Sequence, residues 1–324
     1  MFSHTFKDGL LGVVFPIYSM EMEHFCIFSL KIFFMKSSIC LFFVFSIIKV
    51  STSQNISDDF KIYDTKNNQE ITLGEISKAF ANTDVMFFGE LHNDSIAHVL
   101  QIALLDSLIK NYKNIALSLE ALSDDKQNIL NKYLNGSLSA DDFERDAHVW
   151  MPYYHSYKPL IKISKDFGIP VIAANVPNYY DSLVYENGMN VLDSLNDSAK
   201  SFLPPIPYYI PKGAYYEKFS NAMKFHVYMN DSLFESHCLY DATMAYNISR
   251  FWKTHPTFKI FQIIGNFHID NYLGIVEQLR RYANMKFLTI SCFYDENFKN
   301  PNWNEYKNLA DFIIITNPKI KRSL

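Results

Sequence analysis

Six short, continuous apolar runs constrain the fold of this chain more than any other feature of its sequence. The runs cover residues 85–88, 115–119, 171–174, 260–264, 287–290 and 312–315. Each has the length of a buried β-strand, and segments with helical apolar spacing lie between them. The repeated strand–helix–strand pattern predicts an α/β fold, in which a mostly parallel sheet is covered by helices on both faces.

The first helix of this pattern is predicted after Asp94 and Ser95, either of which can cap it. Its apolar residues at helical spacing are Ile96, Val99, Leu100, Ala103, Leu104 and Leu108. On a helical wheel His98 lies opposite the centre of this stripe, so we expect its side chain to face away from the core. The alternative role for His98 is contact with a ligand or with a second subunit.

The rest of the chain is predicted to surround this sheet as one domain, residues 54–324. A hairpin over 58–72 and a helix at 73–80 come first, because Asn67-Asn68 is a turn signal between two short β-like runs. Residues 176–259 show no comparable strand pattern and contain a proline-rich break at 204–211. We expect this segment to form a helical cap, whose tyrosines, Tyr215 among them, are candidates to line a pocket.

Residues 1–53 have the pattern of a secretory signal that follows an upstream extension. Lys36 precedes an apolar stretch at 39–48, and the small residues Ser51 and Ser53 suit a cleavage site. A retained anchor that associates the protein with a membrane is the alternative. An exported protein, periplasmic or associated with the cell envelope, is therefore expected, and its remaining cysteines, Cys238 and Cys292, would form either one disulfide or two free thiols.

Composition and motif content exclude several classes of function. With 48% hydrophobic residues the chain is too apolar to be disordered, and 30 basic against 34 acidic residues predict no nucleic-acid partner. The sequence also lacks the Gly-x-Ser-x-Gly, Walker, His-Glu-x-x-His and Gly-x-Gly-x-x-Gly motifs. Serine hydrolases, nucleotide-binding proteins and classical zinc proteases therefore find no support.

The strongest indication of chemistry is a motif that occurs twice, each time directly after a predicted strand. The strand at 85–88 leads into Gly89-Glu90-Leu91-His92, and the strand at 260–264 leads into Gly265-Asn266-Phe267-His268. Two further strands end in Glu120 and Asn175. If these strands are neighbours, the side chains that converge at the carboxyl edge of the sheet are those of Glu90, His92, Glu120, Asn175 and His268.

Two imidazoles and two carboxylates allow two kinds of site. Glu90, His92, Glu120 and His268 could bind a divalent metal ion through nitrogen and oxygen atoms, or they could form a general base held by a carboxylate partner. The structural alternative is that these residues only cap helices and bind loop amides. A separate aromatic run, Trp150 to Tyr157, offers Tyr154, His155 and Tyr157 as candidates to bind iron or to stack on a flat ligand.

Short motifs in a fixed order make the chain resemble the ChaN-type haem-binding uptake proteins of the Tiki superfamily. The opening motif runs from Gly89 to Asp94 and continues with His98 and Gln101. The later motifs are Glu120, Trp150 with Tyr157 and Pro159, Asn175, the stretch 238–245 with Asp241 and Met244, and 265–268. The chain departs from the family at Phe267, where a small residue is usual, and at His237, where Gln is frequent.

The resemblance implies a protein that binds haem, or an iron-containing small molecule, for iron acquisition. Tyrosine and histidine are suitable axial ligands of haem iron. We expect these ligands to come from Tyr154, His155 and Tyr157, from the helical cap or from His98, all lying outside the Glu/His cluster; a homodimer is also expected. The alternative function is a metal-dependent or Glu/His-dependent hydrolase, an esterase or a protease, that uses Glu90, His92, Glu120 and His268.

Overall fold

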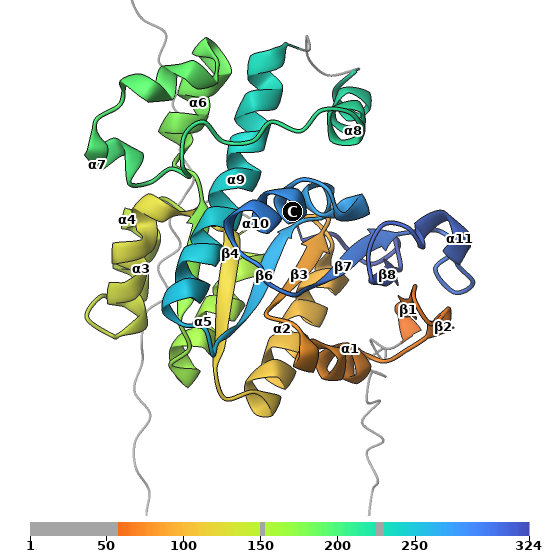
Figure 1. Cartoon of the computed structure of the whole chain (residues 1–324). Helices are drawn as coiled ribbons and strands as arrows, with labels where there is room; N and C mark the ends of the chain where they lie inside the picture. The colour runs from red at the N-terminus through yellow and green to blue at the C-terminus, as the bar shows by residue number, and fades with distance from the viewer. Residues whose placement is uncertain (1–57, 150–152, 225–229, 324) are drawn as a thin grey trace, which may run out of the picture. The chain divides into compact units, whose positions relative to one another are not determined.

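The computed structural model describes residues 58–149, 153–224 and 230–323 (Figure 1). The predicted signal sequence or anchor at 1–53 and Trp150 of the aromatic run lie outside these residues. None of the described helices is long and apolar enough to cross a membrane.

The described residues form an α/β fold around one mixed, mostly parallel sheet, as the apolar runs predicted. In the order β2-β1-β8-β7-β3-β6-β4-β5, the strands from β8 to β5 are mutually parallel, and the edge hairpin of β1 and β2 is antiparallel. The strands are β1 (Phe60–Asp64), β2 (Gln69–Glu70), β3 (Val85–Glu90), β4 (Ile115–Ser123), β5 (Val171–Asn175), β6 (Lys259–Gly265), β7 (Phe287–Tyr294) and β8 (Phe312–Thr316).

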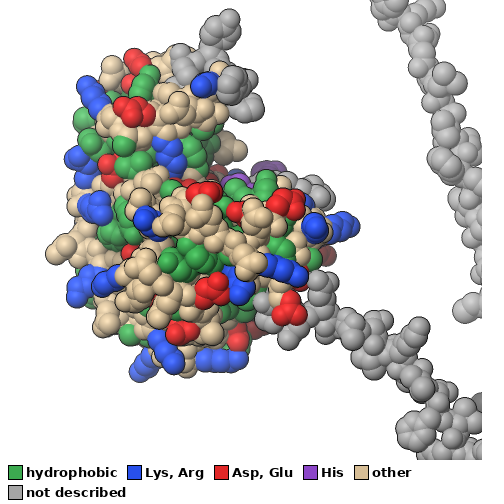
Figure 2. Space-filling model, turned by 90° about the vertical axis from the view of Figure 1, so that its right-hand side faces the viewer, with side chains coloured by type: hydrophobic (Ala, Val, Ile, Leu, Met, Phe, Trp, Pro, Cys, Tyr) green, Lys and Arg blue, Asp and Glu red, His purple; other side chains and the backbone are tan. Residues whose placement is uncertain are grey.

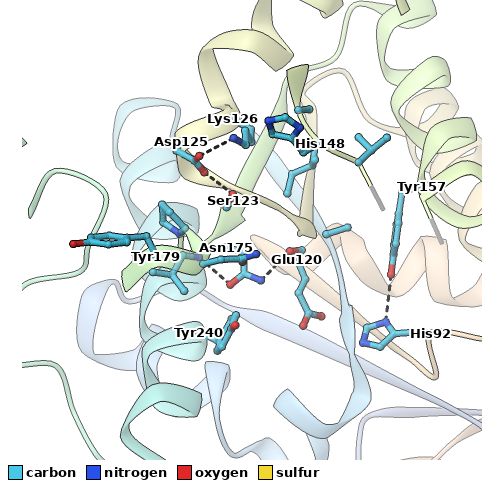
Figure 3. A pocket seen from close by; sticks show the side chains of 17 residues that line it. His92, Glu120, Ser123, Asp125, Lys126, His148, Tyr157, Asn175, Tyr179 and Tyr240 are labelled. Carbon is cyan, nitrogen blue, oxygen red and sulfur yellow. Dashed lines mark hydrogen bonds and ion pairs between the residues drawn. The ribbon is translucent and has the colours of Figure 1, made fainter. Parts of the chain in front are cut away.

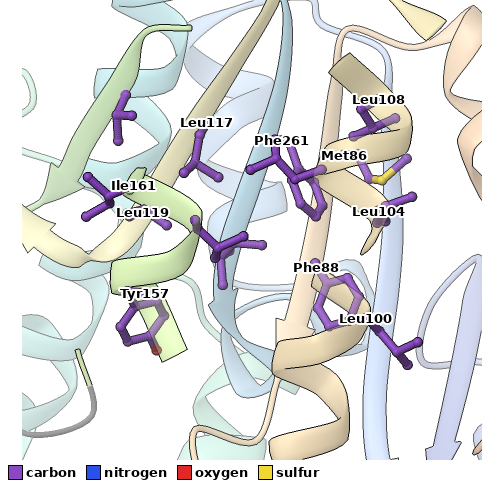
Figure 4. Close-up of a cluster of buried hydrophobic side chains, with 14 of the residues drawn as sticks. Met86, Phe88, Leu100, Leu104, Leu108, Leu117, Leu119, Tyr157, Ile161 and Phe261 are labelled. Carbon is purple, nitrogen blue, oxygen red and sulfur yellow. The ribbon is translucent and has the colours of Figure 1, made fainter. Parts of the chain in front are cut away.

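Helices cover both faces of the sheet. On one face lie α1 (Leu73–Ala79), α2 (Ser95–Asn111), α3 (Gln127–Leu134), α4 (Ala140–Asp146) and α5 (Lys158–Phe167), whose apolar residues pack against Met86, Phe88, Leu117 and Leu119 (Figure 4). On the other lie α9 (Asp231–Thr254) and α10 (Ile275–Tyr282), which contact Val85, Phe87 and Ile264. The alternation of side chains along β3 explains why both faces are apolar.

The buried face of α2 differs from the predicted one. Val99 is 43% exposed, whereas His98 is 3% exposed and Gln101 is fully buried. The prediction that His98 faces away from the core is therefore wrong. The reason is Glu90, a buried carboxylate at the end of β3 that gives His98 and Gln101 a partner inside the protein.

The segment between β5 and β6 is helical, with no strand in its described part. It contains α6 (Asn178–Asn187), α7 (Asp197–Lys200), α8 (Ala214–Met223) and α9. The first half of α9 joins the other three in a separate apolar cluster, whereas Met244 and Ile248 in its second half pack on the sheet. A short helix, α11 (Trp303–Tyr306), precedes β8. Cys238 and Cys292 are both buried and free.

Candidate functional site

The strand order brings the two Gly-x-x-His turns together. β3 and β6 are parallel neighbours in register, with Glu90 opposite Gly265, and β4 and β5 follow β6. Their carboxyl ends therefore meet at one edge, as the motif predicted. Glu90, His92, Glu120, Asn175 and His268 lie at this edge, although they are divided between two hydrogen-bonded clusters.

The two motif glycines lie where the turns approach other parts of the site closely. A Cβ at Gly89 would lie 2.8 Å from Cα of Asn266, so the turn after β6 could not pack against β3 with any larger residue there. A Cβ at Gly265 would lie 3.1 Å from Nε2 of His92 and 3.7 Å from Oε2 of Glu120. Gly265 also donates its backbone N–H to Oε2 of Glu120 at 2.6 Å.

Glu90 is the centre of the first cluster and is 1% exposed. Its Oε1 accepts hydrogen bonds from Tyr157 at 2.5 Å and from Nδ1 of His92 at 2.9 Å. Its Oε2 accepts one from Gln101 and lies 3.4 Å from Nε2 of His98. Burial alone would raise the pKa of Glu90, but the hydrogen bonds and charges of the two histidines outweigh it and lower the pKa to about 2. Glu90 is thus a fixed anion.

His92 connects this buried anion to the surface, with 44% of its side chain exposed. Burial of the rest of the ring opposes protonation, but the hydrogen bond to Glu90 and the carboxylate of Glu120 raise the pKa of His92 above its usual value. The ring is therefore oriented through Nδ1 by a carboxylate, which is the arrangement of a histidine that acts as a general base.

The second cluster is built around His268, in the 3₁₀ turn Asn266–His268 after β6. Its Nδ1 lies 2.8 Å from Oδ1 of Asp241 on α9, and its Nε2 lies 3.5 Å from Oε1 of Glu120 on β4. Burial opposes the charge of His268, but Asp241 and Glu120 outweigh it and raise the pKa of the imidazole to about 9. At neutral pH, His268 is accordingly a cation between two carboxylates.

Tyr215 and His237 complete the second cluster. The Tyr215 hydroxyl donates to Oδ2 of Asp241 at 2.5 Å and lies 2.8 Å from Nε2 of His237. The rings of His237 and His268 stack with centroids 4.7 Å apart and planes inclined by 18°. Burial, reinforced by the charges of His268 and Lys218, holds the pKa of His237 well below its usual value.

A cavity of about 540 Å³ opens beside the two clusters (Figure 3). His92, Glu120, Tyr157 and Asn175 line it, together with Asp125, Lys126, His148, Tyr179 and Tyr240. Glu90 and His268 are not among its lining residues, but each contacts one of them: Glu90 contacts His92, and His268 lies 3.5 Å from Glu120. This volume is within the range of roughly 300–1,000 Å³ typical of small-ligand pockets. Viewed from the side, histidine surface is exposed below the cap (Figure 2).

The aromatic run that was expected to bind haem is divided by the structure. Tyr153–Tyr157 forms one π-helical turn before α5, in which Tyr157 is 3% exposed and Tyr154 is 42% exposed. Because Tyr157 and His98 both contact Glu90, the prediction that they lie outside the Glu/His cluster is wrong. Tyr154 and His155 do lie outside that cluster, and both are exposed.

Two further cavities are candidates to bind a ligand: the first borders the Glu90 cluster through His98, and the second shares no residue with either cluster. One, of about 390 Å³, runs along α2 and is lined by Ser95, His98, Val99, Ile102, His155, Lys321, Arg322 and Ser323. We call it the α2 groove. The other, of about 470 Å³, lies in the cap and is lined by Ile210, Pro211, Lys212, Gly213, Tyr216, Asp231, Phe234 and Glu235. We call it the cap groove.

Gln101 and Asp241 were not predicted as partners of the site, although both belong to the motifs. Gln101 follows His98 by three residues and Asp241 follows His237 by four, spacings that place each pair on one face of a helix. Polar pairs at such spacing in otherwise apolar helices were the available signal. Nothing in the sequence indicated that Tyr215 reaches Asp241.

The fold and the two clusters define the class of this protein: an α/β protein with a Glu/His site at the carboxyl edge of a mostly parallel sheet, the usual place for a site in such sheets. The family model "Haem-binding uptake, Tiki superfamily, ChaN" matches residues 76–279. The chain therefore belongs to the ChaN-type haem-binding uptake family, as the motifs predicted.

One solved structure supports this fold, and a second is less similar. ChaN of Campylobacter jejuni, whose structure shows cofacial haem binding, is 17% identical, with a TM-score of 0.60; the match covers 80% of this chain and 97% of that one. A mutant erythromycin esterase in its open conformation is 12% identical, with a TM-score of 0.44 and coverage of 72% and 77%. A search of curated proteins gave no match by sequence.

Proposed function

We propose that this protein is exported and binds haem for iron acquisition, with the porphyrin seated in the α2 groove. Membership in the haem-binding family supports haem as the ligand. The observation that carries the location is the chemistry of the groove: an apolar wall, an exposed imidazole and two cations line the same cavity.

The α2 groove matches the three chemical parts of haem. Val99, which is 43% exposed, and Ile102 offer apolar contact to a porphyrin ring. Lys321 and Arg322 offer positive charge to the two propionates. Arg322 is held in position, since its guanidinium lies 4.0 Å from the Tyr294 ring centroid and 3.9 Å from Oδ1 of Asp94.

His155 is the side chain in this groove that is best placed to be an axial ligand. It is exposed and lines the groove, whereas the Nδ1 atom of His98 is 3.1 Å from both Ser156 Oγ and Ser323 Oγ. Tyr157 is a poor phenolate ligand because burial, together with the charge of Glu90, raises its pKa well above the usual value. When bound, haem supplies the iron centre that is acquired; the chain holds, orients and neutralises it.

A haemin titration of the mature protein tests this location. We expect a saturable Soret shift that is lost or altered in His155→Ala and unchanged in His255→Ala, which removes an exposed histidine at the end of α9. Lys321→Glu should weaken binding up to about five-fold. Absence of a shift in the wild type would refute haem binding, and a shift lost in Tyr216→Phe alone would place the porphyrin in the cap groove instead.

Export and assembly are tested separately. N-terminal sequencing of the protein recovered from cells should find an N-terminus near Gln54, since Ser51 and Ser53 precede the proposed cut. Retention of Met1 or Met35 in exported protein would contradict this. A homodimer remains a prediction, to be checked by light scattering with and without haemin.

A hydrolase that uses the 540 Å³ cavity is the second candidate, and the observation that favours it is the orientation of His92. Glu90 positions the ring and, with its pKa lowered to about 2, is a weak base at neutral pH, so His92 would be the group that activates water. Glu120 and His268 lie beside it and could orient a substrate or hold a metal ion. Ester hydrolysis that is abolished in His92→Ala and retained in His155→Ala would support this function.

A further inference from the structure

His237, Asp241 and His268 form a compact set of metal-ligating groups in the second cluster. Each offers one nitrogen or oxygen atom, and these atoms all lie within 4.8 Å of one another. Among the described residues, no other group of three or more His, Cys, Asp or Glu side chains comes as close together. The group shares only His268 with the predicted metal set of Glu90, His92, Glu120 and His268.

The local structure explains why the three groups converge. His237 and Asp241 are four residues apart on α9 and so lie on the same face of that helix. His268 faces them from the turn after β6, with its ring stacked on that of His237 at 4.7 Å. All three are held by packed elements: Asp241 is fully buried, and only 12% of the His268 side chain is exposed.

The charges of the cluster favour a divalent cation. The carboxylates of Asp241 and Glu120 both point at His268, which can carry a single positive charge. A divalent ion bound at Asp241 would displace the proton of His268 and take its place between the two carboxylates, beside the positive charge of Lys218, because imidazoles bind metals in their neutral form. Tyr215 would remain as an outer partner that hydrogen-bonds the carboxylate ligand, an arrangement common around metal sites.

We propose that His237, Asp241 and His268 bind a divalent transition-metal ion of the zinc class. Two imidazoles and one carboxylate suit Zn²⁺, Co²⁺ or Fe²⁺, whereas Mg²⁺ and Ca²⁺ prefer oxygen ligands alone. Three protein ligands leave a position for water or for a ligand. The site does not depend on haem binding, because its residues lie outside the α2 groove.

The neighbourhood of His237 adds a second reason. Its ring contacts Phe219 at 4.7 Å and Phe267 at 5.4 Å between centroids. Phe267 and His237 are the two positions at which this chain departs from the motifs of its family, and the structure shows that they touch. An apolar wall around a ligating imidazole excludes water and strengthens its interaction with a cation.

Titration of metal-free, tag-free protein with Co²⁺ tests the proposal, because bound Co²⁺ gives a visible absorption band that needs no enzymatic activity. One equivalent should bind the wild type. His237→Gln, which introduces the residue frequent in the family, should weaken binding at least about ten-fold, and Asp241→Asn and His268→Gln at least as much. His255→Gln, at the exposed end of α9, should bind as the wild type does.

Other results would overturn it. No Co²⁺ band in the wild type, or wild-type binding in His237→Gln, would show that this triad is only a hydrogen-bonded network. Loss of binding in His92→Gln together with retention in His237→Gln would assign the ion to the other set. Circular dichroism and thermal unfolding of each variant separate loss of a ligand from loss of the fold, and His237→Gln keeps the test valid if Asp241→Asn does not fold.

Discussion

Two carboxylate–imidazole pairs, Glu90–His92 and Asp241–His268, lie at the carboxyl ends of the neighbouring strands β3 and β6 and are built in opposite ways. In the first, the carboxylate belongs to the strand and is sealed inside, while its histidine is 44% exposed. In the second, the histidine follows the strand with only 12% of its side chain exposed, and the fully buried carboxylate comes from α9. One motif, repeated, therefore presents a ring to solvent in one place and encloses it in the other.

The difference gives the buried carboxylate of the first pair and the histidine of the second pair distinct roles. Glu90 accepts from three side chains and approaches a fourth, so it serves to hold other groups in place. His268 has a carboxylate on each ring nitrogen and serves as the positive centre of its cluster. The four predictions below test this contrast, in order of decreasing effect.

Removal of the Glu90 carboxylate should give the largest loss of stability. Glu90→Ala leaves the donors of Gln101, Tyr157 and the two histidines without their buried acceptor, which should lower the free energy of unfolding by about 3–5 kcal/mol. Urea denaturation measures this. Glu70→Ala removes a largely exposed carboxylate of β2 and should change stability by less than about 0.5 kcal/mol. Equal effects of the two substitutions would contradict the buried-anion role.

The two pairs should lose their contributions at opposite ends of the pH scale. Glu90 has its pKa lowered from 4.5 to about 2, so its contribution is present above pH 4.5 and lost as the pH falls towards 2. His268 has its pKa raised from 6.5 to about 9, so its contribution is present below pH 6.5 and lost as the pH rises through 9. Each shift corresponds to about 3 kcal/mol.

Denaturation curves between pH 3 and pH 10 measure these contributions. The acid decline should flatten in Glu90→Gln, and the alkaline decline should flatten in His268→Gln. A single variant that flattened both declines would show that the clusters titrate as one unit, against the separation described above.

The two tyrosines that donate to the carboxylates should make comparable contributions. Tyr157 and Tyr215 each donate a hydroxyl at 2.5 Å, to Glu90 and Asp241 respectively. Tyr157→Phe and Tyr215→Phe should each cost about 1.5–3 kcal/mol, the range for a hydrogen bond to a charged group. A negligible cost for Tyr215→Phe alone would indicate that the hydroxyl mainly serves His237.

The motif glycines should differ, although they occupy equivalent positions. Gly89→Ala would push its Cβ against the backbone of Asn266 at 2.8 Å, and should cost about 1–3 kcal/mol. Gly265→Ala meets side-chain atoms of His92 at 3.1 Å and should cost less than about 1 kcal/mol. Thermal unfolding compares the two, and a greater loss for Gly265→Ala would reverse the interpretation of these contacts.

The strands were predictable because their apolar runs are continuous and buried on both faces, and the meeting of the two Gly-x-x-His turns followed from the parallel order. The orientation of α2 was not predictable from its stripe, because Val99 and Ala103 are as apolar as the residues that are buried. Only the position of Glu90, which depends on the packing of α2 against β3, turns His98 and Gln101 inward. The spacing of apolar residues along the chain cannot predict contacts between segments distant in sequence, such as the hydrogen bond from Tyr215 to Asp241.

The length of helix α9 decides where a chimaera between members of this family can be joined. Its 24 residues form one rod of about 36 Å that begins in the cap and ends on the sheet. His237 and Asp241 lie on that rod, one turn apart. A chimaera that takes the cap together with the whole of α9 from a relative would also take that relative's residues at positions 237 and 241. A chimaera joined before Asp231 would exchange only α6, α7 and α8, and would keep His237 and Asp241.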